Sequence, residues 1–171
     1  TMLYRLVENN QKPIIKVVAT SKEHGDVPTF NTIGMIEGVE KPDEYVILSA
    51  HFDSWDGGQG TTDNGTGSIV MLEAMRILKK LYPNPKRTIM VGHWGSEEQG
   101  LNGSRAFVED YPKIVDNIQA LFNQDNGTGR VVDLSGSGFL HSYDYLSRWL
   151  APVPRDVSKH MYIHILHKQN I

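Results

Sequence analysis

The sequence predicts an α/β fold, specifically a three-layer α/β/α sandwich with a mixed, largely parallel central sheet. Short β-branched or apolar runs alternate with a longer segment of helical periodicity. Polar and acidic residues follow three of these runs where each one ends. In sheets of this kind, ligands bind outside the carboxyl ends of the strands. We interpret residues 1–171 as one domain.

The first elements are expected to begin the sheet. Residues 13–20 (PIIKVVAT) and 31–39 (NTIGMIEGV) are β-branched runs separated by a polar stretch that contains Gly and Pro, which predicts two paired antiparallel strands. Residues 45–50 (YVILSA) form a short continuous apolar run, which is typical of a central strand covered on both faces. His51 stands at the carboxyl end of that strand.

A glycine-rich loop after His51 leads into a predicted helix. Residues 69–81 (IVMLEAMRILKKL) place apolar side chains at helical spacing, and the prolines that follow end the helix. Residues 88–94 (TIMVGHW) and 118–122 (IQALF) are predicted as two further strands. Acidic residues stand just beyond the end of both strands.

The composition excludes several classes of function. Seventeen Lys and Arg against twenty Asp and Glu give a net charge of -3, so the chain has no basic surface for nucleic acid. No stretch approaches the roughly 18 apolar residues of a membrane span, and the start of the chain lacks the apolar core of a signal peptide. Because the chain has 0 cysteines, a metal must be held by His, Asp and Glu, which suits zinc and some other divalent ions.

Four segments supply candidate metal ligands at the ends of the predicted strands. Each is ambiguous alone: a strand-end histidine, an Asp-Asn-Gly turn and paired acids after a strand are all common without a metal. Together they would crowd carboxylates into one pocket, where like charges raise each other's pKa unless a cation compensates. The segments are those around His51 and Asp53, Asp63, Glu97 and Glu98, and Asp125.

Three motifs in this order resemble the co-catalytic dizinc peptidases of family M28. They are AHFDSWDGGQGTTDNGTG, RTIMVGHWGSEEQGLNGS and FNQDNG, and the first is especially similar to the carboxypeptidase Q branch. The resemblance implies a partial M28 catalytic domain with the phosphorylase/hydrolase-like fold of zinc peptidases, incomplete at its C-terminus.

The resemblance also implies a role for each candidate residue. His51 and Asp125 would bind one zinc ion, Asp63 would bridge two, and Glu98 would bind the other. Glu97 would be the general base, and Asp53 would orient the His51 ring.

The expected activity is that of a metal-dependent exopeptidase, which hydrolyses a short peptide with a metal-activated water. One alternative is a glutaminyl-cyclase-like transferase with a single zinc ion. Another is a truncated, non-catalytic remnant that folds by self-association, for example as a homodimer, because an unpaired sheet edge invites pairing. The resemblance also suggests a secreted, periplasmic or lysosomal compartment.

The resemblance implies two zinc ions, or one or none if the family's fifth metal ligand is missing from this chain. The family supplies a histidine well downstream of the last aspartate. Here His160, His164 and His167 follow at a spacing that would share one helical face, and His141 is a further candidate. We favour the simpler interpretation that residues 159–171 are a non-native or disordered tail.

Other residues near the motifs have plainer explanations. His93 falls inside a predicted strand, where a core histidine is expected more often than a ligand. Trp55 and Trp94 either line a substrate pocket or pack over the site.

Overall fold

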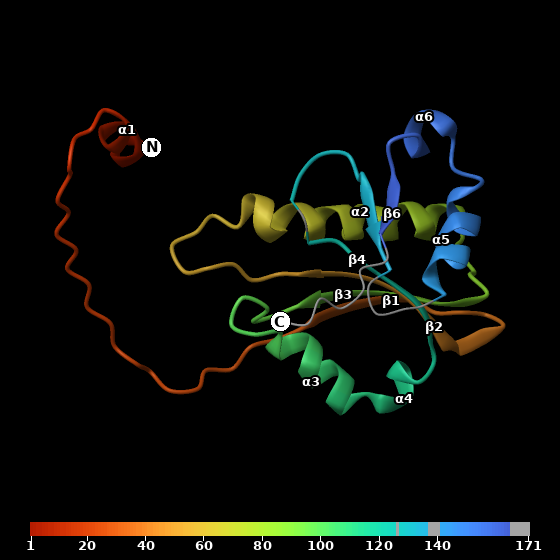
Figure 1. Cartoon of the computed structure of the whole chain (residues 1–171). Helices are drawn as coiled ribbons and strands as arrows, with labels where there is room; N and C mark the ends of the chain where they lie inside the picture. The colour runs from red at the N-terminus through yellow and green to blue at the C-terminus, as the bar shows by residue number, and fades with distance from the viewer. Residues whose placement is uncertain (126, 137–140, 165–171) are drawn as a thin grey trace.

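A four-stranded sheet forms the centre of the computed structural model, which describes residues 1–125, 127–136 and 141–164 (Figure 1). The strand order is β1-β3-β2-β4. β1 runs antiparallel to β3, whereas β2 runs parallel to both β3 and β4, so the sheet is mixed and largely parallel. The strands are β1 (Thr32–Ile36), β2 (Lys41–His51), β3 (Arg87–Trp94) and β4 (Ile118–Asn123).

Helices cover both faces of this sheet. α2 (Thr66–Leu81) lies along one face, and α3 (Asn102–Asp110) with α4 (Pro112–Val115) lies on the other (Figure 1). The predicted three-layer α/β/α arrangement is therefore confirmed. Because β2 and β4 run parallel, their carboxyl ends meet at one edge of the sheet, and the polar residues that follow them lie together.

The core divides between the two faces because side chains alternate along each strand. On one face the apolar side of α2 packs on the sheet, with lysines in its last turn where the helix dipole favours cations. The buried residues of this cluster are Leu48, Ala50, Met71 and Val91. On the other face they are Ile47, Met90, Trp94 and Phe107.

Trp94 and His93 fill opposite faces of the same strand end. The ring centroids of Trp94 and Phe107 lie 5.1 Å apart, and Trp94 is a buried core residue. His93 is 3% exposed, as the sequence predicts, and stacks on Phe52 with ring centroids 5.6 Å apart. Trp55 is 61% exposed.

The predicted hairpin between residues 13–20 and 31–39 is wrong. Residues 13–20 form no strand, and Ile14 is 99% exposed. β1 instead pairs with β3, in a register that places Thr32 opposite His93. β-branched composition indicates that a segment can form a strand, but a strand also needs a partner to pair with. β1 pairs with β3, so residues 13–20 do not pair with β1.

The remaining elements lie outside this sandwich. β5 and β6 form a separate parallel pair, so His164, at the end of β6, is in a strand and not on the helical face expected for the tail histidines. His167 lies outside the described residues. None of the described helices has the length and apolar character needed to cross a membrane. The bounds are α1 (Met2–Glu8), β5 (Asp133–Ser135), α5 (Ser142–Leu150), α6 (Arg155–Ser158) and β6 (Tyr162–His164).

Candidate metal centre

His51 is the fixed point of the site because it ends the central strand β2 and its side chain is buried. Its Nδ1 lies 3.0 Å from the main-chain carbonyl oxygen of Asp53. Its Nε2 faces the carboxyl edge of the sheet, where the loops converge. A histidine that binds a metal through one ring nitrogen usually donates a hydrogen bond from the other, often to a main-chain carbonyl oxygen.

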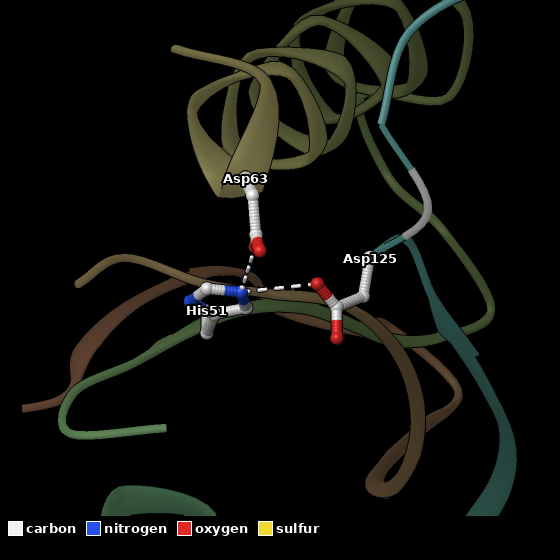
Figure 2. Close-up of side chains that lie close together, drawn as sticks. All are labelled: His51, Asp63 and Asp125. Atoms are coloured by element: carbon white, nitrogen blue, oxygen red, sulfur yellow. Dashed lines mark hydrogen bonds and ion pairs between the residues drawn. The ribbon is translucent and has the colours of Figure 1, made fainter. Parts of the chain in front are cut away.

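Two carboxylates meet the Nε2 atom of His51 from different segments. Asp63 lies in a short irregular turn, η1 (Thr61–Gly65), just before α2, and its Oδ1 is 2.9 Å from Nε2. Asp125 follows β4, and its Oδ1 is 3.0 Å from the same nitrogen. Figure 2 shows the two carboxylates reaching His51 from the start of the helix and from beyond the strand.

Asn64 ties together the segments that carry these two aspartates. It is 2% exposed, its Nδ2 donates to the carbonyl oxygen of Gln124 at 2.8 Å, and its Oδ1 accepts from the amide of Gly67 at 3.1 Å. A Cβ atom at Gly67 would overlap with Asn64 Oδ1 and with the Gln124 carbonyl oxygen. The close approach of η1 to the end of β4 therefore requires glycine at position 67.

Asn64 is a site residue that the motifs do not predict. An asparagine that accepts a hydrogen bond from an amide three residues ahead is common where a helix begins. That local signal was present in the Asp-Asn-Gly turn. The bond to Gln124, 60 residues away in sequence, could not be anticipated from it.

The end of β4 is held against β2 by a second set of bonds. Ser49 Oγ donates to Asn123 Oδ1 at 2.8 Å, and the amide of Gln124 donates to the carbonyl oxygen of Ser49 at 3.0 Å. These bonds continue the β2–β4 pairing up to the residue before Asp125. They place Asp125 beside His51, which lies two residues beyond Ser49.

Glu97 and Glu98 follow β3 on the same edge of the sheet. Glu97 Oε2 lies 4.0 Å from His51 Nε2, and the Glu97 side chain is 25% exposed. The carboxylate of Asp53 accepts hydrogen bonds from both glutamate amides, at 2.9 Å for Glu97 and 3.2 Å for Glu98. Asp53 Oδ1 also lies 3.6 Å from His51 Nδ1.

The negative charges at the site favour a bound cation. Burial opposes a charge on His51, but the carboxylates of Asp125, Asp63 and Glu97 outweigh it and raise the pKa of His51. Burial and the neighbouring charge of Asp63 raise the pKa of Glu98. Across the described part of the chain, no Lys or Arg forms an ion pair with any of these acids.

Three of the four predicted metal ligands form a compact donor set. One ligand atom each from His51, Asp63 and Asp125 lies within 4.8 Å of the others. Imidazole nitrogen with carboxylate oxygens is a donor set that suits zinc. Glu98 lies outside this group, as do His141 and His160, in the part of the chain that the structure describes.

A cavity of about 260 Å³ opens beside the donor set. Glu97, His51 and Asp125 line its polar end. Apolar side chains of α3, α4 and β4 line much of the rest, among them Phe107, Val115 and Leu121. The geometry therefore combines a candidate metal centre, a nearby carboxylate and an apolar cavity.

The family model of peptidase family M28 matches residues 31–159. Carboxypeptidase Q of Xenopus laevis is 37% identical over 127 residues, which are 74% of this chain and 27% of that protein. Carboxypeptidase Q of Homo sapiens is 34% identical over the same shares. The chain thus spans about a quarter of the length of these relatives.

Solved structures agree with this assignment. A peptidase M28 precursor from Shewanella amazonensis superposes with a TM-score of 0.61 at 29% identity, over 78% of this chain and 29% of that one. BSAP, a zinc aminopeptidase from Bacillus subtilis, gives a TM-score of 0.51 at 34% identity, over 56% of this chain and 24% of that one. With a family model that matches most of its length and a sheet edge that brings the motif residues together, this chain belongs to peptidase family M28.

Proposed function

We propose that this chain carries the catalytic core of a zinc-dependent exopeptidase that acts on short peptides. The observation that supports it best is that ligand atoms of His51, Asp63 and Asp125 lie within 4.8 Å of one another. Among the described residues, no lysine or arginine forms an ion pair with these two aspartates. Relatives named carboxypeptidase Q and zinc aminopeptidase both remove residues from the end of a chain, in agreement with this proposal.

The residues divide between holding zinc and moving a proton. His51, Asp63 and Asp125 would hold an ion, and Glu98 would complete a second position next to Asp63. Burial and the charge of Asp63 already raise the pKa of Glu98. Bound zinc would polarise the scissile carbonyl and lower the pKa of a coordinated water. Two ions would also balance the three ligand carboxylates.

Glu97 is proposed as the general base. Its carboxylate lines the cavity and stands 4.0 Å from His51 Nε2, close to the candidate metal position without belonging to the donor set. From there it would take the proton of the attacking water and then deliver it to the leaving amine. Glu97 follows β3, in a loop whose main chain is held in place because the amide of Glu97 donates to Asp53 Oδ1. A fixed main chain suits a residue that must transfer a proton at a defined position.

Metal counting combined with an activity panel tests the proposal. Purified protein is stripped with a chelator, titrated with zinc, analysed for metal content, and assayed on aminoacyl, dipeptide and C-terminal glutamate substrates. We expect two zinc ions per chain and turnover that the chelator abolishes. His24→Ala, at an exposed histidine outside the site, serves as the matched control for His51→Ala.

The alternatives give different results in the same experiment. A site that saturates at one zinc ion and cyclises N-terminal glutamine would identify a glutaminyl-cyclase-like transferase. Zinc binding without turnover on any peptide would identify a non-catalytic remnant. Sedimentation of the same sample reports whether the chain is a monomer or a self-associated dimer.

A further inference from the structure

Ser49 and Asn123 form a polar pair near the candidate metal centre. They lie directly opposite each other where β2 pairs with β4, and Ser49 Oγ donates to Asn123 Oδ1 at 2.8 Å. His51 and Asp125 follow two residues later on the same two segments. At about 3.3 Å per residue, the pair lies roughly 7 Å along the strands from the level of His51 and Asp125.

The Ser49 hydroxyl determines which end of the Asn123 carboxamide faces it. Ser49 is 1% exposed, and its hydroxyl has no other hydrogen-bond acceptor in the described structure. A buried hydroxyl proton without an acceptor is unfavourable, so the oxygen of the Asn123 side chain must face Ser49. The NH₂ group of the carboxamide therefore points away from Ser49.

The NH₂ group of Asn123 is free to bind a ligand. Asn123 is exposed, and its Nδ2 donates to no other group among the described residues. Asn123 and Ser49 both line the cavity of about 260 Å³, as does Leu121, which lies on the same face of β4 as Asn123. The carboxamide is thus a fixed, neutral donor at the border between the acidic and the apolar parts of the cavity.

The surroundings of Asn123 select the kind of acceptor that it would bind. Glu97, which holds no metal in the proposed function, lines the same cavity, and its carboxylate disfavours a negatively charged acceptor. The hydroxyl of Ser104, another lining residue, is already used, since it donates to the Leu101 carbonyl oxygen at 3.2 Å. A main-chain carbonyl oxygen is a neutral acceptor that every peptide carries. Burying it beside apolar side chains is unfavourable unless a donor meets it.

We propose that Asn123 is a substrate-binding residue whose NH₂ group donates to a main-chain carbonyl oxygen of the peptide, while Ser49 holds the carboxamide in that orientation. The effect on turnover rests on the proposed peptidase function. A bond that forms in the bound substrate and persists through the reaction stabilises the ground state and the transition state alike. Its loss therefore raises KM with little change in kcat.

The kinetic test compares Asn123→Asp and Asn123→Ala with the control Gln119→Glu. Aspartate keeps the acceptor for Ser49 Oγ and removes the donor, whereas alanine removes the donor without adding a charge. Gln119 is exposed on β4 outside the cavity lining, so glutamate there adds the same charge to the same strand. Steady-state kinetics of the zinc-loaded chain on leucylglycine give kcat and KM.

NMR provides a measurement that does not need turnover. The ¹H–¹⁵N signals of the Asn123 NH₂ group, identified by their loss in Asn123→Asp, are followed in the chain with and without zinc. The probes are leucinamide and 3-methylbutylamine. Both have an amino group and an isobutyl side chain, but only leucinamide has a carbonyl group.

We expect leucinamide to shift the Asn123 NH₂ signals and 3-methylbutylamine to leave them in place. Asn123→Asp and Asn123→Ala should each raise KM about 3–10-fold, the size expected for one neutral hydrogen bond. In both variants kcat should stay within about twofold of the wild type. Ser49→Ala should move the NH₂ signals without any probe and raise KM by less. Gln119→Glu should match the wild type.

Three results would overturn the inference. NH₂ signals that leucinamide leaves in place in both forms of the chain, or that both probes move equally, show that Asn123 binds no peptide carbonyl. Wild-type KM in both Asn123 variants removes the effect on substrate binding, and a lower kcat at unchanged KM shows that Asn123 acts on the catalytic groups instead. If Asn123→Ala does not fold, Asn123→Asp and its charge-matched control decide the KM prediction. If the wild type shows no turnover, the proposed function fails, while the NMR titration still decides whether Asn123 binds a carbonyl group.

Discussion

His51 Nε2 lies 2.9 Å from Asp63 Oδ1, although β2 and the turn before α2 are separated by the whole glycine-rich loop. The same nitrogen lies 3.0 Å from Asp125 Oδ1. Because Nε2 carries at most one proton, it cannot donate a full hydrogen bond to both carboxylates, and two negative charges stand close together. A divalent cation relieves both problems because it attracts all three donor atoms at once.

Zinc is therefore expected to stabilise the folded chain. At a zinc concentration 100 times Kd, the free energy of unfolding should rise by about 2.7 kcal/mol, which raises Tm by about 5–10 °C in a chain of this size. Thermal unfolding with zinc and with a chelator measures the shift. His51→Ala should abolish it, and the exposed-site variant His24→Ala should retain it. An equal shift in His51→Ala would exclude His51 as a ligand.

Glu97→Gln should separate zinc binding from turnover. Glutamine has nearly the shape of glutamate but cannot take a proton, so kcat should fall by about 10²–10⁴-fold. Zinc content, measured by elemental analysis, should stay at the wild-type level because Glu97 lies outside the three-residue donor set. Glu109→Gln, at an exposed position of α3, is the control. Preserved turnover in Glu97→Gln would refute the assignment of the base.

Gly67→Ala should destabilise the fold where α2 begins. The new methyl group would overlap with Asn64 Oδ1 and the Gln124 carbonyl oxygen. Moving these atoms would disturb the bond from Asn64 Nδ2 to the Gln124 carbonyl oxygen and the bond from the Gly67 amide to Asn64 Oδ1. We expect a loss of about 1–3 kcal/mol in urea unfolding. Ile69→Ala, in the same turn of the helix at a 68% exposed position, should change stability by no more than about 0.5 kcal/mol. Equal stability of Gly67→Ala and wild type would argue against the close approach.

His93 should make the fold sensitive to acid. Burial lowers the pKa of His93 below its ordinary value of 6.5, an effect that an interaction with the Ser68 main chain only partly offsets. Above pH 6.5 the ring is neutral in both states, but below it the unfolded chain binds a proton more readily than the native one. Stability should therefore fall as the pH drops through this range.

His93→Leu should reduce that acid sensitivity. The Nε2 of His93 is buried without a hydrogen-bond partner in the described structure, so an apolar residue of similar volume should cost less than about 1.5 kcal/mol at neutral pH. Urea unfolding across the acid range measures the slope of stability against pH. His24→Leu, at an exposed site, should leave the slope unchanged. A wild-type slope in His93→Leu would show that other groups cause the acid response.

The sequence predicted the elements that have strong periodicity and a buried face. The helix expected at residues 69–81 begins earlier, at Thr66, and the strand expected at residues 45–50 extends from Lys41 to His51. Both segments carry their apolar pattern in the part that packs on the core. Their ends depend on contacts from elsewhere, such as the pairing of Lys41 with Arg87, which no local pattern encodes.

The sequence predicts which strand ends carry the site residues. It does not predict the hydrogen bonds that hold the connecting loops together. Parallel strands place His51 and Asp125 together, and the family motifs select the residues. The partners of Asn64 and Asp53 are main-chain groups more than 40 residues away, and any residue could supply them. Bonds of this kind leave no trace in the identity of the residue that supplies the main-chain group, whether that group donates or accepts.

The donor set also spans a long stretch of chain, since His51 and Asp125 are 74 residues apart. An ion held by both, and by Asp63 between them, would act as a covalent cross-link does, closing two loops in a single step. Loss of the ion would then release the glycine-rich loop and the end of β4 together while the sheet stayed intact. Proteases should reveal that state by cutting residues 52–62 in the chelated protein and sparing them in the zinc-loaded one.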